Sequence, residues 1–324
     1  MARTNTLGNF LTDVASAIRE KKGTTDAILA SNFDTEIASI ESGVDINEYL
    51  SDTITKGTSS SGGWLKTIIK LRSPLTVEGT SAEYMFYKYL LNELPQIDTS
   101  NVTDMSYMFD SCTNLTTIPQ LDTSNVNYMY NMFGSCTKLT TIPQLDTSNV
   151  VDMNQMFYRC TNLTAIPQLD TSNVNRMSYM FYSCTNLTTI PQLDTSNVTN
   201  MGYTFDSCTN LTTIPQLNGE KLTVVIGAFS FCESLENFNG IINLGQEYST
   251  TENANNSNYK LDLSSSTLLT EQSIINILNN LYDIATKGCN TQTVTLGTTN
   301  LAKLTSTEGQ QALASAQSKG WNIN

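Results

Sequence analysis

The chain has 324 residues and a formal net charge of −13, from 30 acidic against 17 basic side chains, and it contains no histidine. Without an imidazole, serine–histidine and cysteine–histidine catalysis and zinc sites with histidine ligands are excluded. Phosphate backbones and anionic lipids are bound by clustered Lys and Arg, so the acidic balance also predicts neither a nucleic-acid nor a membrane partner.

Residues 1–54 are predicted to form a small helical segment. Apolar side chains recur at helical spacing over residues 7–18, and a second short helix is predicted over residues 34–40. So short a segment with few large apolar side chains makes a poor core of its own. We therefore expect it to serve attachment or oligomerisation, and residues 55–74 to be a Gly- and Ser-rich linker and entry to the next region.

Residues 75–240 repeat with a period of 24 residues, and one unit reads P-Q-L-D-T-S-N-V-x-x-M-x-x-M-F-x-x-C-T-N-L-T-x-I. A period between 20 and 50 residues indicates stacked units that contact only their neighbours. One ladder of equivalent residues is Cys112, Cys136, Cys160, Cys184, Cys208 and Cys232. A second ladder is Phe109, Phe133, Phe157, Phe181 and Phe205.

Within each unit, the pattern predicts a helix and then a strand. Met105, Met108, Phe109 and Cys112 follow the i, i+3, i+4, i+7 spacing of one buried helical face. The preceding D-T-S-N motif supplies oxygen acceptors for a helix start. The β-branched run that ends at Pro119 favours an extended backbone. The predicted fold is an α/β repeat solenoid of helix-plus-strand units.

Residues 241–324 are predicted to hold a polar insertion and the C-terminal cap repeats. The insertion centres on residues 252–256. Beyond it, Thr270 opens a predicted helix, and another helix is expected near residues 308–314. The chain begins without the apolar run of a secretory signal and holds no stretch of about 20 apolar residues, which predicts synthesis and folding in a cytoplasm with reduced cysteines.

The unit C-T-N-L-T-T-I-P-Q-L-D-T-S-N-V-T-x-M-x-x-M-F resembles the BspA-like (Treponema-type) leucine-rich repeats of bacterial surface proteins and of phages of Gram-positive hosts. This resemblance covers about residues 75–324. Residues 10–23 and 33–37 are similar to the N-terminal segment of tail and baseplate proteins from such phages. Together these resemblances imply a leucine-rich-repeat fold and adhesion rather than catalysis.

The predicted function is that of a non-catalytic phage virion protein, a tail fibre or baseplate protein that is assembled in the host cytoplasm. Its expected partners are a host cell-surface polysaccharide or protein and, through the N-terminal segment, other tail or baseplate proteins. A homotrimer is left open. One alternative is a bacterial BspA-like surface adhesin, which the lack of a signal peptide weakens. Another is a purely structural tail or capsid-decoration protein without a receptor.

The candidate binding surface consists of repeat positions that vary between copies, on the predicted helix face opposite the Met and Phe residues. Tyrosine with scattered polar side chains suits the recognition of carbohydrate or protein. The residues are Asp104, Tyr107, Tyr128, Tyr158, Arg176, Tyr179, Tyr182 and Tyr203. A solvated surface without a partner and the threonine row that starts at Thr116 are rival interpretations.

Two ladders invite a metal or catalytic interpretation that the pattern does not favour. The cysteines lack the C-x-x-C pairs that give a metal two ligands on one turn, so they are predicted to be small buried apolar residues. The aspartates that recur from Asp98 to Asp194 belong to D-T-S-N turns and lack the dense spacing of a calcium loop. A glycosidase needs one carboxyl group as acid and another as nucleophile, and the two roles require different environments. The recurring aspartates have identical environments, so they do not suit this chemistry. We predict no metal, no cofactor and no enzyme activity.

Overall fold

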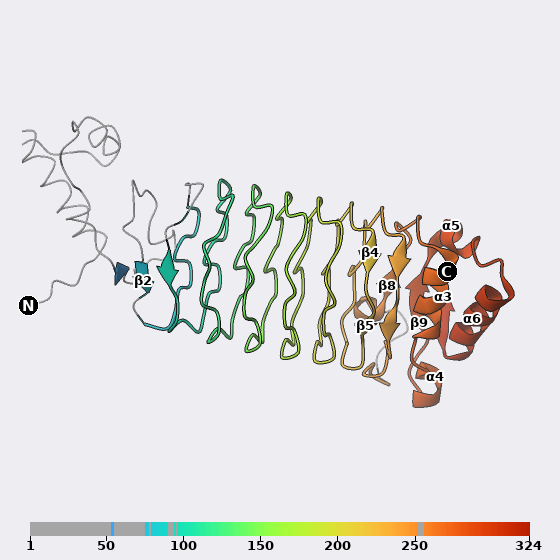
Figure 1. The fold of residues 1–324 in the computed structure, drawn as a ribbon. Helices are drawn as coiled ribbons and strands as arrows, with labels where there is room; N and C mark the ends of the chain where they lie inside the picture. The colour runs from blue at the N-terminus through green and yellow to red at the C-terminus, as the bar shows by residue number, and fades with distance from the viewer. Residues whose placement is uncertain (1–52, 55–74, 78, 90–93, 95, 252–255) are drawn as a thin grey trace, which may run out of the picture.

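The computed structural model describes residues 53–54, 75–77, 79–89, 94, 96–251 and 256–324. The two helices predicted within residues 1–54 lie outside the described residues. In Figure 1 the repeats follow one another as coils of chain in a row, and the helices gather at the C-terminal end. The chain therefore has the stacked-repeat fold that its period predicts.

The helix predicted in each repeat is wrong, because the backbone there forms successive turns. The amide of Met108 donates to the carbonyl of Met105 over 3.1 Å, and the same i to i−3 bond closes a second turn at Cys112. Tyr107 and Ser111, the third residues of these turns, have φ of 57° and 62°. Positive φ at that place is typical of type II turns and is incompatible with an α-helix. The predicted buried residues are nevertheless buried.

Hydrogen bonds between repeats replace those that a helix would make within itself. The amide of Met105 donates to the carbonyl of Tyr128 over 2.9 Å, and the amide of Tyr107 donates to that of Tyr130 over 2.8 Å. Every second amide of the turn segment thus points to the next repeat. Parallel bridges at one position link successive repeats from Ser81 to Val224. Each repeat is held to its neighbour much as parallel strands are.

The predicted strand of each repeat becomes a strand only near the ends of the row. The described strands up to residue 242 are β1 (Thr53–Ile54), β2 (Leu75–Val77), β3 (Ile97–Asp98), β4 (Thr213–Ile214), β5 (Leu217–Asn218), β6 (Asn237–Phe238) and β7 (Ile241–Ile242). Pairing is parallel in the order β1-β2-β3, and likewise β4 with β6 and β5 with β7. In the central repeats the segment is extended without a regular ladder, since the proline in it has no amide to donate.

Larger elements follow the last repeats. They are the 3₁₀ helix η3 (Ser257–Tyr259), β8 (Leu261–Asp262), α3 (Glu271–Asn279), α4 (Ile284–Lys287), β9 (Gln292–Thr295), α5 (Gly297–Leu301), α6 (Thr307–Ser318) and β10 (Trp321–Ile323). The strands form a parallel sheet in the order β10-β9-β8. Thr270 caps α3, because its hydroxyl accepts the amide of Ser273 over 3.2 Å.

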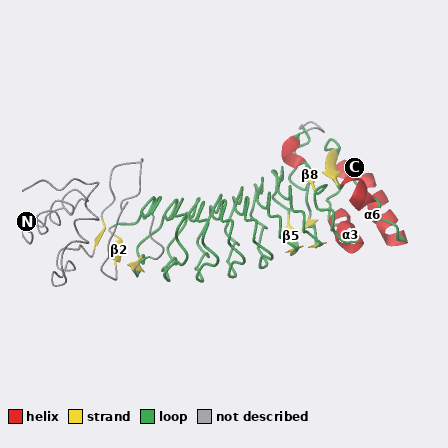
Figure 2. Ribbon diagram, turned by 90° about the horizontal axis from the view of Figure 1, so that it is seen from above, coloured by secondary structure: helices red, strands yellow, loops and turns green. Residues whose placement is uncertain are grey.

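Figure 2 shows α3 and α6 beyond the repeats at the C-terminal end, where the two helices pack on each other. Helices begin at Thr270 and near residue 308, as the sequence predicts. Trp321 in β10 is buried, and its indole nitrogen donates to the carbonyl of Tyr282 over 2.8 Å. The domain boundaries at residues 54, 74 and 240 stay predictions.

Columns of equivalent side chains form the core. The rings of successive ladder phenylalanines stack with centroids 5.5–5.6 Å apart. The six ladder cysteines are fully buried. Each thiol donates to the carbonyl of a phenylalanine in an earlier repeat, as Cys160 does to Phe133 over 3.0 Å. Burial raises the pKa of Cys160 to about 12, so the thiol is neutral and belongs to the packing.

Candidate binding surface

The structure places the eight candidate residues at three positions of the repeat. Asp104, Tyr128 and Arg176 share the position at which parallel bridges connect the repeats. Tyr107, Tyr179 and Tyr203 share the turn position with positive φ. Tyr158 and Tyr182 share the position three residues further on. All eight are exposed or half-buried, but they lie on turns and bridges, and not on a helix as the sequence analysis expects.

Four of these tyrosines form one group, which we call the tyrosine cluster: Tyr158, Tyr179, Tyr182 and Tyr203. The rings of Tyr158 and Tyr182 stack with centroids 5.1 Å apart, and those of Tyr179 and Tyr203 stack at 4.9 Å. Tyr179 and Tyr182, from the same repeat, join the two pairs at 5.7 Å. Ring faces inside the cluster cover one another, so the cluster presents ring edges and hydroxyls more than free faces.

Tyr107 belongs to a second group nearer the N-terminus. Its ring stacks on Tyr84 at 4.4 Å and lies 5.0 Å from that of Tyr130. Burial, together with the hydrogen bond to Tyr130, raises the pKa of Tyr107. In the next repeat, Asn131 and Gly134 take the two positions that the tyrosines hold elsewhere, so the two groups are separate. Tyr84 and Tyr130 were not predicted from the sequence, although Tyr84 is in register with Tyr107 in the shortened first copy.

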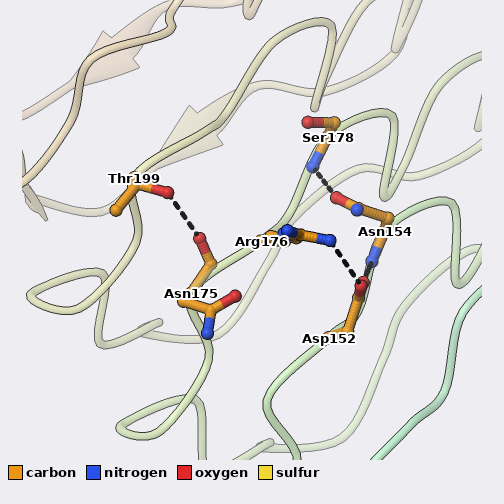
Figure 3. A network of polar contacts seen from close by, with 6 residues as sticks. All are labelled: Asp152, Asn154, Asn175, Arg176, Ser178 and Thr199. Atoms are coloured by element: carbon orange, nitrogen blue, oxygen red, sulfur yellow. Dashed lines mark hydrogen bonds and ion pairs between the residues drawn. The ribbon is translucent and has the colours of Figure 1, made fainter.

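Arg176 takes part in a polar network that spans neighbouring repeats (Figure 3). The carboxylate of Asp152 accepts the amide of Asn154 over 2.9 Å, and its other oxygen lies 3.7 Å from the Arg176 guanidinium. The amide oxygen of Asn154 accepts the backbone amide of Ser178 over 2.8 Å. Burial raises the pKa of Asp152, which the hydrogen bond to Asn154 and the charge of Arg176 oppose. The Arg176 side chain is 64 % exposed and stays accessible.

A groove that the sequence analysis missed runs along the repeats, with a volume of 1110 Å³. Equivalent Q-L-D-T segments line it, beginning at Gln144, Gln168 and Gln192, and residues 216–218 and Ile242 line its far end. Its signal in the sequence is the invariance of this segment between copies. Invariance is also typical of buried scaffold residues. Only the stacked structure shows that the Gln and Asp of this segment are exposed.

Intramolecular hydrogen bonds hold the polar side chains of the groove in place. One carboxylate oxygen of Asp146 accepts both the amide and the hydroxyl of Ser148, over 3.0 and 2.7 Å, and these bonds lower the pKa of Asp146. The side-chain nitrogen of Gln144 donates to the carbonyl of Gln168 over 2.7 Å. Within the part of the chain that the structure describes, no three Cys, Asp or Glu side chains are grouped so that they could hold a metal ion.

Two overlapping stretches, residues 80–189 and 161–265, match the family model described as "Mycoplasma protein of unknown function, DUF285". The chain belongs to the DUF285 family. No curated protein matches it. Among solved structures, a leucine-rich repeat protein from Bacteroides ovatus is similar at 13 % identity over 77 % of this chain and 81 % of that chain. The TM-score between the two structures is 0.18.

The DUF285 match covers the repeats together with the tyrosine cluster and the groove, and it ends before α3. It does not reach the N-terminal segment, which carries the resemblance to phage tail proteins. Among the described residues, none of the helices has the length and apolar character needed to cross a membrane. The DUF285 match therefore supports the repeat architecture and does not by itself indicate a function.

Proposed function

We propose that this protein is a non-catalytic adhesion protein that binds a host cell-surface polysaccharide or protein through its repeats. The observation that carries the proposal is the tyrosine cluster, in which four aromatic side chains from three consecutive repeats meet at the surface. Tyrosine supplies contact area and a polar hydroxyl at low entropic cost, which suits a recognition surface.

Stacking prepares the cluster for binding. Because Tyr158 packs on Tyr182, and Tyr179 on Tyr203, the rings have little freedom left to lose when a ligand binds. The Arg159 guanidinium lies 5.2 Å from the Tyr158 ring and adds a donor at the rim. A ligand would accept and donate hydrogen bonds at the hydroxyls and pack on the ring edges.

The resemblance to BspA-like repeats and to phage tail N-termini supports the finer assignment, a tail fibre or baseplate protein in the virion. In this assignment the N-terminal segment attaches the chain to other tail or baseplate proteins, either as a single chain or as a homotrimer. The DUF285 match supports the repeat architecture alone. A bacterial surface adhesin would use the same cluster, whereas a structural decoration protein would bind no cell.

The test is saturable binding of the labelled full chain to Gram-positive host cells, in competition with intact phage. A variant with Tyr→Phe at residues 158, 179, 182 and 203 keeps the stacked rings and removes the hydroxyls, and it should bind roughly ten-fold more weakly. The matched control changes Tyr84, Tyr107 and Tyr130 to Phe and should bind like the parent. Displacement by phage would favour the virion assignment over the bacterial adhesin.

No saturable binding to cells that the phage itself adsorbs would reject the adhesion proposal and leave the structural role. Equal binding by the parent and both variants would reject the tyrosine cluster as the contact surface. Release of sugar or peptide from the cell wall by the parent chain would reject the non-catalytic assignment.

A further inference from the structure

A small pocket with a volume of 260 Å³ lies where α3 meets the last repeats. The described residues that line it all carry carboxamide side chains, and none of them is charged or apolar. Two of them belong to the repeats, and α3 with its C-cap supplies the other three. The five residues are Gln216, Asn239, Asn276, Asn279 and Asn280.

Glycine ends the glutamine row of the repeats at this pocket. Gly240 stands one period after Gln216, at the position that the earlier copies fill with Gln. A Cβ at residue 240 would lie 2.7 Å from the side-chain nitrogen of Asn280 and 2.9 Å from the carbonyl oxygen of Asn276. The side chain of Asn280 donates to the carbonyl of Asn239 over 2.9 Å. The end of α3 therefore occupies the place of the next glutamine.

Gln216 differs from the earlier glutamines of the row, because its side chain is left without a partner. In the earlier copies the side-chain nitrogen donates to two carbonyls, as Gln192 does to Leu193 over 3.0 Å and to Gln216 over 2.7 Å. Among the described residues, the Gln216 side chain makes neither bond. The side chains of Asn239 and Asn279 likewise have no partner in the described part of the chain. All three are exposed, so the pocket offers three complete carboxamides to a ligand.

From this arrangement we infer that the pocket binds a single neutral sugar unit at the end of a glycan chain. A sugar hydroxyl both donates and accepts hydrogen bonds, and so does a carboxamide. A charged ligand would need an opposite charge, and an apolar ligand would need an apolar lining, neither of which the described lining supplies. The volume of 260 Å³ lies below the roughly 300–1,000 Å³ of drug-sized sites, which suits one sugar ring.

The pocket shares no residue with the tyrosine cluster, so this inference does not depend on the adhesion proposal. None of the described lining residues is aromatic, so a bound sugar gains hydrogen bonds without stacking on a ring. We therefore expect weak binding, with a Kd of about 1 mM.

The test is saturation-transfer NMR of the full chain with the methyl glycosides of glucose, galactose and mannose. Methyl glycosides represent a terminal unit, because their anomeric oxygen is blocked as it is in a chain. The pocket variant changes Asn239 and Asn279 to Ala, which breaks no bond among the described residues. The control variant changes Asn175 and Asn322 to Ala, two exposed asparagines outside the pocket whose side chains also have no partner among the described residues.

We expect at least one of the three glycosides to bind the parent chain saturably. The pocket variant should bind that glycoside about ten-fold more weakly, because two of the carboxamides that contact it are lost. The control variant should stay within about two-fold of the parent. If the pocket variant fails to show the parent's circular dichroism spectrum, Asn279→Ala alone replaces it, with an expected weakening of about three-fold.

Absence of saturable binding by all three glycosides, up to about ten times the expected Kd, would overturn the inference. Equal binding by the parent and the pocket variant would overturn it as well, and so would equal weakening in the control variant. Tighter binding of glucuronate than of methyl glucoside would reject a neutral ligand. Binding of the free sugars without their methyl glycosides would reject the end of a glycan chain as the source.

The Tyr→Phe variant of the tyrosine cluster separates this inference from the adhesion proposal. Loss of glycoside binding in that variant, together with unchanged binding in the pocket variant, would place the sugar at the tyrosine cluster and overturn the pocket. Failure of the chain to bind cells would reject the adhesion proposal and leave the glycoside measurement unaffected.

Discussion

At the scale of single residues, the cysteine of each repeat combines packing with one hydrogen bond. The Cys184 thiol donates to the carbonyl of Phe157 over 3.1 Å, and that carbonyl also accepts the amide of Cys160. A carbonyl has two lone pairs, so both bonds can form. Cysteine is small enough to lie beside the stacked phenylalanines and still supplies a donor, which alanine or valine would not.

Burial should protect the ladder thiols from reagents. Burial raises the pKa of Cys160 and of Cys232 to about 12, so almost no thiolate is present near pH 8. We expect at most one thiol of the native chain, the half-buried Cys289, to react quickly with a disulfide reagent such as dithionitrobenzoate. All seven should react in denaturant. Fast reaction of further thiols, or an unchanged count in Cys289→Ser, would contradict the buried ladder.

Aspartates of the D-T-S-N turns make stability depend on pH. The side-chain and backbone hydrogen bonds from Ser124 lower the pKa of Asp122 in the folded chain, and Asp98 behaves likewise with Ser100. A lowered folded pKa means stabilisation that is complete above the unfolded pKa and is lost as pH falls through the folded pKa. The urea midpoint should therefore fall between about pH 5 and 3, and Asp98→Asn with Asp122→Asn should flatten that fall.

The control for this measurement is Asp152→Asn. Burial raises the pKa of Asp152, so its ionised form costs stability above its folded pKa, and this cost disappears as pH falls. Removing Asp152 should therefore steepen the acid loss or leave it unchanged. A parallel shift of the whole pH curve in the Asp98 and Asp122 variant would show that the turn carboxylates do not cause the pH dependence.

At the scale of the element, each repeat from the one with Tyr84 to the one with Tyr203 holds two non-glycine residues in the left-handed region. In one copy these are Tyr179 and Ser183, both with φ of 57°. Such residues carry a conformational cost of about 1 kcal/mol or more each. The cost is offset because this backbone directs alternate amides to the next repeat, as Tyr179 does to Gly202 over 2.9 Å.

Relief of this strain should be measurable at Ser183, whose hydroxyl bonds to nothing among the described residues. Ser183→Gly should raise the free energy of unfolding by about 0.5–1 kcal/mol, since glycine adopts positive φ without a steric penalty. Ser183→Ala removes the hydroxyl and keeps the penalty, so it should not stabilise. Chemical denaturation of both variants provides the measurement, and equal stability of the two would show that φ is not the cause.

At the scale of the whole molecule, side-chain bonds tie each repeat to its neighbours. Asn149 donates to the carbonyl of Ser124 over 2.8 Å, and Thr147 donates to that of Asp170 over 2.9 Å. The same pairs recur in the next copies at Asn173 and Thr171. Because equivalent residues meet at every junction, the number of repeats can change without new contacts, provided that the register is kept.

Deletion of residues 120–143 should therefore yield a folded, shorter chain. It joins Pro119 to Gln144, which then takes the place of Gln120 in the same sequence context. We expect a cooperative thermal transition at a lower temperature than that of the parent. The control deletes residues 120–131, half a period, which misaligns the phenylalanine and cysteine columns and should abolish cooperative unfolding. Similar transitions for both deletions would contradict a stack held in register.

The sequence by itself determined the period, the buried set and two of the C-terminal helices, α3 and α6, but not α4 and α5. Met105, Met108, Phe109 and Cys112 are buried as predicted, because apolar side chains at a constant place in every copy can only form a common core. The helix that begins after Thr270 was predictable from its cap and its own apolar spacing. These features depend on local chemistry or on repetition along the chain, and both can be read from the sequence without knowing how the copies are stacked.

Only the tertiary structure decided the backbone of the repeat and its surfaces. The i, i+3, i+4, i+7 spacing fits two successive turns as well as a helix, and the neighbouring repeat decides between them by accepting the amides of Met105 and Tyr107. The stacked faces of Tyr158 and Tyr182 and the groove lined by Gln144 and Gln168 likewise exist only between repeats. Contacts one period apart depend on how the copies are stacked, which the pattern of a single copy does not contain.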